Sequence, residues 1–207
     1  SIASKFKNSK LSVFGSAESG LSIKGGDYDL CLQIPDADQK KVVKKIGSML
    51  RGQGMEEVQV LTRAKVPIVK FIDPRSGVPV DISINNSLAI HNTNLLKTYS
   101  NLDERVKQLT LCVKHWAYHR NISDAPNGTL SSYAWSILVI SHLQKKQVVP
   151  NLQNGDSRTL LEIEGKEYDL TINESAVLES KSDASIEELA LSFFTEFATY
   201  ELSLIHI

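Results

Sequence analysis

The stretch that decides the fold, residues 11–32, has the sequence LSVFGSAESGLSIKGGDYDLCL. Its apolar start leads into Gly15 and Ser16, and a polar segment then leads into a second run in which apolar and polar residues alternate. Such alternation is typical of a β-strand, whose successive side chains point to opposite faces of a sheet. It places Asp27 and Asp29 on one face. We therefore expect two strands joined by a polar loop, with a pair of carboxylates at the start of the second strand.

Paired carboxylates on one strand face indicate a metal site when a third carboxylate joins them. On its own, an Asp-x-Asp sequence is most often a solvated edge or a turn, because neighbouring carboxylates repel each other unless something compensates them. Asp81 supplies a third carboxylate from the alternating run VPVDISI, residues 78–84. The turn sequence DPRSG, residues 73–77, predicts a hairpin that places Asp81 in the same sheet. Mg²⁺ prefers oxygen ligands, and three converging carboxylates form a site for two ions.

The Gly15-Ser16 turn predicts the other half of a phosphate site. Gly15 has no Cβ, so its backbone can come close to an anion. The amides that follow it can donate hydrogen bonds to phosphate oxygens. A Gly-Ser pair is common in ordinary turns, so this prediction depends on the carboxylates nearby.

The rest of the pattern predicts a small mixed sheet followed by helices. A helix over residues 38–50 and a strand over 58–62 complete the first part, with the helix on one face of the sheet and the carboxylate face left open. The later elements are expected to be helices at 88–99 and 103–118, a helix through 135–142, a short hairpin near 160–170 and a final helix that begins at the capping box SIEE, residues 185–188. The three Phe residues of the final helix are expected in the core, and His142 is expected to be a polar residue on a helix face.

Taken together, the motifs resemble those of a known enzyme family. The pattern shared with the DNA polymerase β-type nucleotidyltransferases consists of FGS at residues 14–16, DYD at 27–29 and Asp81. The stretches that narrow the resemblance to the terminal uridylyltransferases and cytoplasmic poly(A) polymerases are RAKVPIVKF at 63–71, NNSLAIHNT at 85–93 and GTLSSY at 128–133. The resemblance covers about residues 11–144.

This resemblance implies an α+β fold with two domains. Residues 1–86 would form a polymerase β-like nucleotidyltransferase palm, which is a small mixed sheet with a helix packed on one face. Residues 87–207 would form a mostly helical central (PAP-associated) domain. The resemblance also places a helix before the first strand, so we expect the chain to be cut at both ends. The final hexapeptide LSLIHI, residues 202–207, departs from the preceding pattern, and we interpret it as an assembly artefact.

The resemblance also assigns residues to a bound nucleotide. The positions that match nucleotide-binding positions of the family are Gly15, Ser16, Ala89, Asn92, Thr93, Lys114, Ser132 and Tyr133. Lys114 is expected to project from the long helix, and it matches a lysine that contacts the phosphates. Asn92 and Thr93 match positions that contact the ribose. The ring of Tyr133 can stack on the base, an interaction worth roughly 1–3 kcal/mol, and the neighbouring hydroxyl of Ser132 can contact a phosphate.

The implied function is template-independent addition of UMP from UTP to RNA 3′ ends. Asp27, Asp29 and Asp81 would be the catalytic residues and would hold two Mg²⁺ or Mn²⁺ ions, and Asp81 would accept the proton of the 3′-hydroxyl. A poly(A) polymerase that adds AMP from ATP is the alternative, because Tyr118 stands where uridylyltransferases often have a second lysine. In the family, the loop that selects the base lies beyond the final helix. Transfer to a small acceptor and a non-catalytic RNA-binding fragment are further alternatives.

Composition sets the other expectations. The chain has 207 residues, a formal net charge of −1 and two cysteines, so composition alone does not indicate a nucleic-acid binder. We expect buried thiols in a reducing compartment and no disulfide. No signal peptide or membrane-spanning run is visible. The expected protein is a cytoplasmic monomer, with mitochondrial and nuclear locations left open, whose partners are an RNA 3′ end and a nucleoside triphosphate and not a membrane.

Overall fold

A computed structural model describes residues 5–64, 66–154, 158–163, 165–173 and 180–198. The chain divides into two compact units, Ser1–Thr98 and Tyr99–Ile207. The division lies inside helix α3 (Ser87–Leu102), whereas the predicted boundary at residue 86 precedes this helix. The larger part of α3 belongs to the first unit, where Lys97 Nζ forms an ion pair of 2.6 Å with Glu18 Oε1 of α1. The hexapeptide at residues 202–207 lies outside the described residues.

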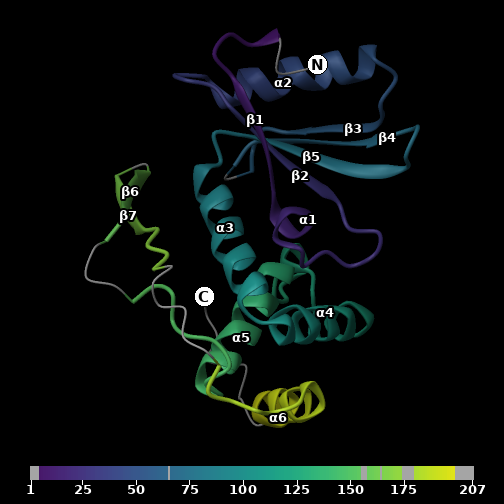
Figure 1. The fold of residues 1–207 in the computed structure, drawn as a ribbon. Helices are drawn as coiled ribbons and strands as arrows, with labels where there is room; N and C mark the ends of the chain where they lie inside the picture. The colour runs from purple at the N-terminus through teal and green to yellow at the C-terminus, as the bar shows by residue number, and fades with distance from the viewer. Residues whose placement is uncertain (1–4, 65, 155–157, 164, 174–179, 199–207) are drawn as a thin grey trace. The chain divides into compact units, whose positions relative to one another are not determined.

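The first unit contains the predicted mixed sheet. Its elements before α3 are β1 (Lys10–Phe14), α1 (Gly15–Ser19), β2 (Tyr28–Gln33), α2 (Gln39–Gly52), β3 (Glu56–Leu61), β4 (Ile68–Asp73) and β5 (Val78–Ile84). The strand order is β1-β2-β5-β4-β3, and only β2 and β5 are parallel neighbours. The predicted hairpin joins β4 to β5, and α2 lies along one side of the sheet (Figure 1). The order of strands and helix confirms the predicted sheet with a helix on one face.

One short element differs from the prediction. The segment after β1 was expected to be a turn and a loop, but it forms the five-residue helix α1. Gly15 opens it with φ at +78°, and Gly20 closes it in the left-handed region, with its N–H donating to the carbonyl of Ser16. A five-residue helix has too few turns to produce an apolar period, so the sequence pattern contains no sign of it.

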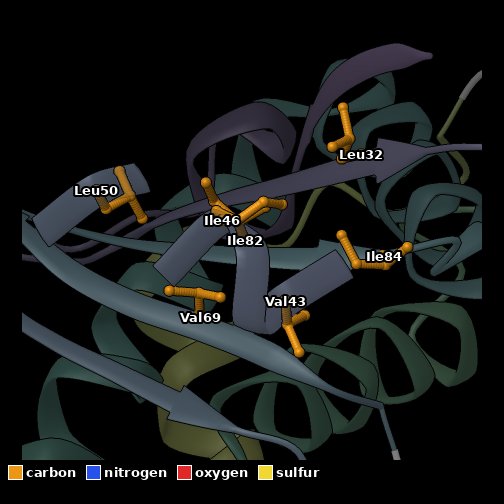
Figure 2. Packing of buried hydrophobic residues seen from close by; sticks show 7 residues of the cluster. All are labelled: Leu32, Val43, Ile46, Leu50, Val69, Ile82 and Ile84. Atoms are coloured by element: carbon orange, nitrogen blue, oxygen red, sulfur yellow. The ribbon is translucent and has the colours of Figure 1, made fainter. Parts of the chain in front are cut away.

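The core of the first unit lies between α2 and the sheet. Asp38 caps α2, since its side chain accepts a hydrogen bond of 3.1 Å from the N–H of Lys41. The side chains that pack together, each at most 2% exposed, are Leu32, Val43, Ile46, Leu50, Val69, Ile82 and Ile84 (Figure 2). Three of them come from one face of α2 and four from the sheet strands. Because side chains alternate along a strand, this packing turns the opposite face of β2 and β5 away from the core.

The second unit is mostly helical, as predicted. Apart from the end of α3, its elements are α4 (Glu104–His119), the short helix η2 (Ala125–Asn127), α5 (Ser132–Lys145), β6 (Leu160–Ile163), β7 (Lys166–Asp169) and α6 (Ile186–Ala198). Asp103 and Ser131 cap α4 and α5. The predicted capping box opens α6, because the N–H of Ser185 donates to Glu188 Oε2 over 2.8 Å and the N–H of Glu188 donates to Ser185 Oγ over 3.3 Å. No helix that the structure describes has the length and apolar character needed to cross a membrane.

Two expectations about side chains in the second unit were wrong. His142 is buried and not on an exposed helix face, because α6 covers it: its Nδ1 lies 2.8 Å from Glu196 Oε2 and its Nε2 lies 2.9 Å from Ser192 Oγ. Cys31 is buried as expected, but Cys112 of α4 is exposed. Both cysteines are free. The prediction that the three Phe residues of α6 lie in the core is confirmed for Phe193, which is fully buried. Phe194 and Phe197 are half-buried.

Candidate active site

The register of the sheet aligns the site residues in one row. Asp29 of β2 pairs with Asp81 of the parallel strand β5. On either side, Phe14 of β1 pairs with Asp29, and Lys70 of β4 pairs with Asp81. Residues directly opposite on neighbouring strands share a face of the sheet. This row faces away from α2, because the next residue along β5, Ile82, lies in the core under that helix.

The structure brings the three predicted aspartates together. Asp27 lies two residues before Asp29 and therefore on the same side of the strand. Asp27, Asp29 and Asp81 each offer a carboxylate oxygen, and these oxygens lie within 4.8 Å of one another. All three residues are partly exposed, so a cation can reach them from solvent. A cluster that consists of carboxylate oxygens suits Mg²⁺ or Mn²⁺, since these ions prefer hard oxygen ligands.

The aspartates carry more negative charge than their surroundings compensate. The pKa of Asp29 is raised to about 7, first by burial and then by the charges of Asp27 and Asp81, while Lys70 opposes the rise. Burial also raises the pKa of Asp81, while Lys70 opposes this rise. A carboxylate whose pKa is near neutrality is only partly ionised at physiological pH. A bound divalent cation would offset the repulsion between these carboxylates, so the three residues are suited to hold a metal ion.

Lys70 belongs to the site, although the sequence analysis did not single it out. Its Nζ donates a hydrogen bond to Asp81 Oδ2. The Lys70 side chain is 42% exposed and the Asp81 side chain is 15% exposed, so the ion pair lies at the edge of the cluster. The predicted hairpin contained the necessary information. A turn over residues 73–77 pairs Asp73 with Val78, and counting back along both strands pairs Lys70 with Asp81.

Gly15 lies directly against the carboxylate of Asp29. A Cβ added to Gly15 would be 2.1 Å from Asp29 Oδ2, so only glycine fits at this position. The backbone of Gly15 also has φ at +78°, which L side chains rarely adopt. Gly15 therefore leaves room for the carboxylate of Asp29, and its predicted approach to a phosphate stays a prediction.

Thr93 connects α3 to this turn. Thr93 is buried, and its Oγ1 accepts a hydrogen bond of 2.8 Å from the N–H of Gly15. The same hydroxyl donates to the carbonyl of Ala89 over 2.7 Å. Three of the predicted nucleotide-binding residues thus form one hydrogen-bonded chain beside the aspartates. Asn92, half-buried next to Thr93, and Ser16, which follows Gly15 in α1, lie in the same unit.

The other predicted nucleotide contacts lie in the second unit. Lys114 is buried within α4 and is only 4% exposed, whereas we expected it to project from the helix. Ser132 is the first residue of α5, and Tyr133 follows it with 43% of its surface exposed. An exposed aromatic ring at the start of a helix is free to stack on a planar ligand. The assignment of these three residues to a nucleotide stays a prediction.

Comparison with known proteins gives consistent matches over most of the chain. Residues 1–101 match the family model for the central palm domain of mitochondrial-like poly(A) RNA polymerases. Terminal uridylyltransferase 7 of Homo sapiens is 41% identical over 161 residues, which are 73% of this chain and 11% of that protein. Poly(A) RNA polymerase GLD2 of Mus musculus is 35% identical over 221 residues, which are 94% of this chain and 43% of that protein.

A solved structure agrees with these matches. The MgGTP-bound structure of the Cid1 poly(U) polymerase superimposes with a TM-score of 0.84 and 33% sequence identity, covering 96% of this chain and 64% of that chain. The chain thus spans less than two thirds of each of these relatives. The shared palm fold, the matching sequences and the clustered aspartates lead to one assignment. The chain belongs to the family that contains the terminal uridylyltransferases and the GLD2-type poly(A) RNA polymerases.

Proposed function

We propose that this protein adds nucleotides from a nucleoside triphosphate to RNA 3′ ends without a template, with UTP as the substrate. One observation carries the proposal: Asp27, Asp29 and Asp81 converge within 4.8 Å on the open face of the sheet. The similarity to proteins named terminal uridylyltransferase and poly(U) polymerase supports it. A further structure of Cid1, in complex with its short product ApU, shows that this relative carries an RNA product.

The three aspartates would hold two Mg²⁺ or Mn²⁺ ions. When bound, such ions neutralise the charge that develops on the attacking and leaving oxygens of phosphoryl transfer. Asp29 fits this role because it pairs with Asp81 across two parallel strands, and its carboxylate oxygen lies within 4.8 Å of those of Asp27 and Asp81. Gly15 and Thr93 would fix Asp29 from the side of α1, because Gly15 leaves room for its carboxylate and Thr93 holds the backbone of Gly15.

The side chains then have separate tasks in the transfer. The RNA 3′-oxygen forms a bond to the α-phosphorus, the bond from that phosphorus to the bridging oxygen breaks, and pyrophosphate leaves. Asp81 would accept the proton of the 3′-hydroxyl. Ser16 and Lys114 would bind the triphosphate, and Tyr133 would stack on the base. Positioning and charge neutralisation then suffice for catalysis, with no covalent enzyme intermediate.

Use of ATP is the second candidate. The similarity to GLD2 covers 94% of the chain, and GLD2 is named a poly(A) RNA polymerase. Tyr118, which stands at the position of the second lysine of many uridylyltransferases, is 62% exposed on α4 and leaves that position without a positive charge. The two candidates share every step at the aspartates and differ in the base that is bound.

Incubation of the chain with end-labelled RNA, Mg²⁺ and each nucleoside triphosphate in turn tests both candidates. We expect extension of the RNA with UTP, no extension in EDTA, and no extension by the Asp81→Ala variant. The variant should keep its circular dichroism spectrum, because Asp81 is not part of the core. Extension with ATP and not with UTP would favour the second candidate, and undiminished extension by Asp81→Ala would reject the proposed site.

A further inference from the structure

Lys70 carries a contact that the proposed reaction does not use. Its ammonium group donates to Asp81 Oδ2, and Asp81 is one of the three candidate metal ligands. Lys70 comes from β4 and reaches Asp81 across the pair formed by β4 and β5. Its contact is therefore set by strand register, which is a rigid feature of the sheet, and not by a loop.

The ion pair places a positive charge beside a cluster of three carboxylates. Asp29 and Asp81 lie next to each other in the row, and Asp27 lies beside them. A single positive charge at this place stabilises the ionised cluster while no metal is bound.

Metal binding at Asp81 would conflict with this contact. A carboxylate oxygen that accepts a hydrogen bond from an ammonium group has less electron density and less room for a divalent ion. The ammonium and the ion would also repel each other at close range. The Lys70 side chain is 42% exposed, so its ammonium can turn into water when an ion arrives.

We propose that Lys70 is a positioning residue that holds the Asp81 carboxylate in the metal-free protein and competes with a divalent cation for it. The inference rests on the proposed function, since it concerns the same site. Lys70 then sets the metal concentration at which the site fills. In the metal-free protein it also keeps the Asp81 carboxylate oriented toward Asp27 and Asp29, an orientation that a bound ion would then maintain.

Titration of the 207-residue chain with Mn²⁺, followed by electron paramagnetic resonance without nucleotide or RNA, tests this role. We expect Lys70→Met to bind Mn²⁺ about tenfold more tightly than the unmodified chain, because a nearby positive charge is removed. Lys70→Arg keeps the charge and should bind Mn²⁺ within about threefold of the unmodified chain. Lys44→Met removes an exposed lysine from α2, on the other side of the sheet, and should leave Mn²⁺ binding unchanged.

Thermal unfolding supplies the second measurement. In EDTA, Lys70→Met should melt at a lower temperature than the unmodified chain, because the cluster loses the ion pair between Lys70 and Asp81. Mn²⁺ should then raise the melting temperature of Lys70→Met more than that of the unmodified chain, since tighter binding gives greater stabilisation. A lysine that is needed only for packing would lower the melting temperature equally with and without Mn²⁺.

The outcomes separate this role from the proposed function. Unchanged or weaker Mn²⁺ binding by Lys70→Met overturns the competition. If Lys70→Met does not fold, Lys70→Gln replaces it, with the same expected tightening and the same contradicting results. Tighter Mn²⁺ binding together with a chain that never extends RNA would support the role of Lys70 and reject nucleotide transfer.

Discussion

Gly15 has no side chain, and Asp29 Oδ2 lies 2.1 Å from the place that a Cβ would take. This close approach ties the turn after β1 to the carboxylate in the middle of the row. The site therefore depends on a residue that carries no functional group of its own. Gly15 contributes by leaving room for the Asp29 carboxylate, and a substitution that fills this room tests the contribution directly.

Gly15→Ala should weaken Mn²⁺ binding by about tenfold or more, because the new Cβ, 2.1 Å from Asp29 Oδ2, displaces the carboxylate. The positive φ adds a cost of about 1–2 kcal/mol in stability. Gly25→Ala is the matched control, since Gly25 has φ at +84° with nothing within 4 Å of an added Cβ. Both variants should lose stability in urea unfolding, and only Gly15→Ala should lose Mn²⁺ binding. Equal Mn²⁺ affinities in the two variants would show that the contact with Asp29 does not matter.

The raised pKa of Asp29 predicts a pH dependence of stability in the metal-free protein. With a pKa of about 7 when folded and 3.8 as the reference, Asp29 binds its proton more strongly in the folded state between these values. This stronger proton binding stabilises the folded state fully at low pH, and the stabilisation is lost as the pH rises through about 7. The loss in the free energy of unfolding is on the order of 2 kcal/mol after allowance for solvent screening.

Urea unfolding in EDTA at several pH values measures this effect. The Asp29→Asn variant cannot titrate at this position. As the pH rises from 5 to about 8, the free energy of unfolding of the unmodified chain should therefore fall relative to that of the variant. Saturating Mn²⁺ at pH 8 should stabilise the unmodified chain more than the variant. Parallel stability curves for the two proteins in EDTA would contradict the raised pKa.

At the scale of elements, α3 holds the turn that carries Gly15. The hydroxyl of Thr93 accepts from the N–H of Gly15 over 2.8 Å and donates to the carbonyl of Ala89 over 2.7 Å. The helix thus fixes the turn through one side chain. The aspartates on β2 and β5 are fixed separately by strand register.

Thr93→Val keeps the shape of the side chain and removes its hydroxyl. We expect a loss of about 1–3 kcal/mol in stability, because the N–H of Gly15 is left without its partner in a partly buried place. Nucleotide incorporation should fall by a larger factor than stability alone explains, since Asp29 shifts with Gly15. Thr93→Ser keeps the hydroxyl and should retain most of the incorporation. A Thr93→Val variant that is fully active would show that α3 does not position the turn.

The sequence pattern predicted most elements because each had its own period. The run at residues 78–84 coincides with β5, and the helix expected over 38–50 overlaps α2 with its cap at Asp38. Helix α1 was not predicted, since five residues contain no repeat. The burial of His142 was not predicted either, because it results from the packing of α6 on α5, which lie far apart in the sequence.

At the scale of the whole chain, the predicted residues fall into two groups. The aspartates, Gly15 and Thr93 meet within the first unit through register and hydrogen bonds. Lys114 and Tyr133 belong to the second unit, where one is buried and the other exposed. Thr93 was assigned through the family resemblance. The convergence of the aspartates could be predicted from motif spacing, because a hairpin and two neighbouring strands connect them. The contact of Lys70 with Asp81 follows from the register of the predicted hairpin, and that of Gly15 with Asp29 from the pairing of β1 with β2, so neither is visible while each strand is considered by itself.

The central claim is that Asp27, Asp29 and Asp81 together bind divalent ions beside a triphosphate. Anomalous diffraction from crystals grown with Mn²⁺ and a non-hydrolysable UTP analogue tests it most directly. The account predicts two Mn²⁺ peaks that are both coordinated by these carboxylates, with the triphosphate of the analogue as a shared ligand. Mn²⁺ bound elsewhere, or an Asp81 carboxylate that takes no part in coordination, would contradict it.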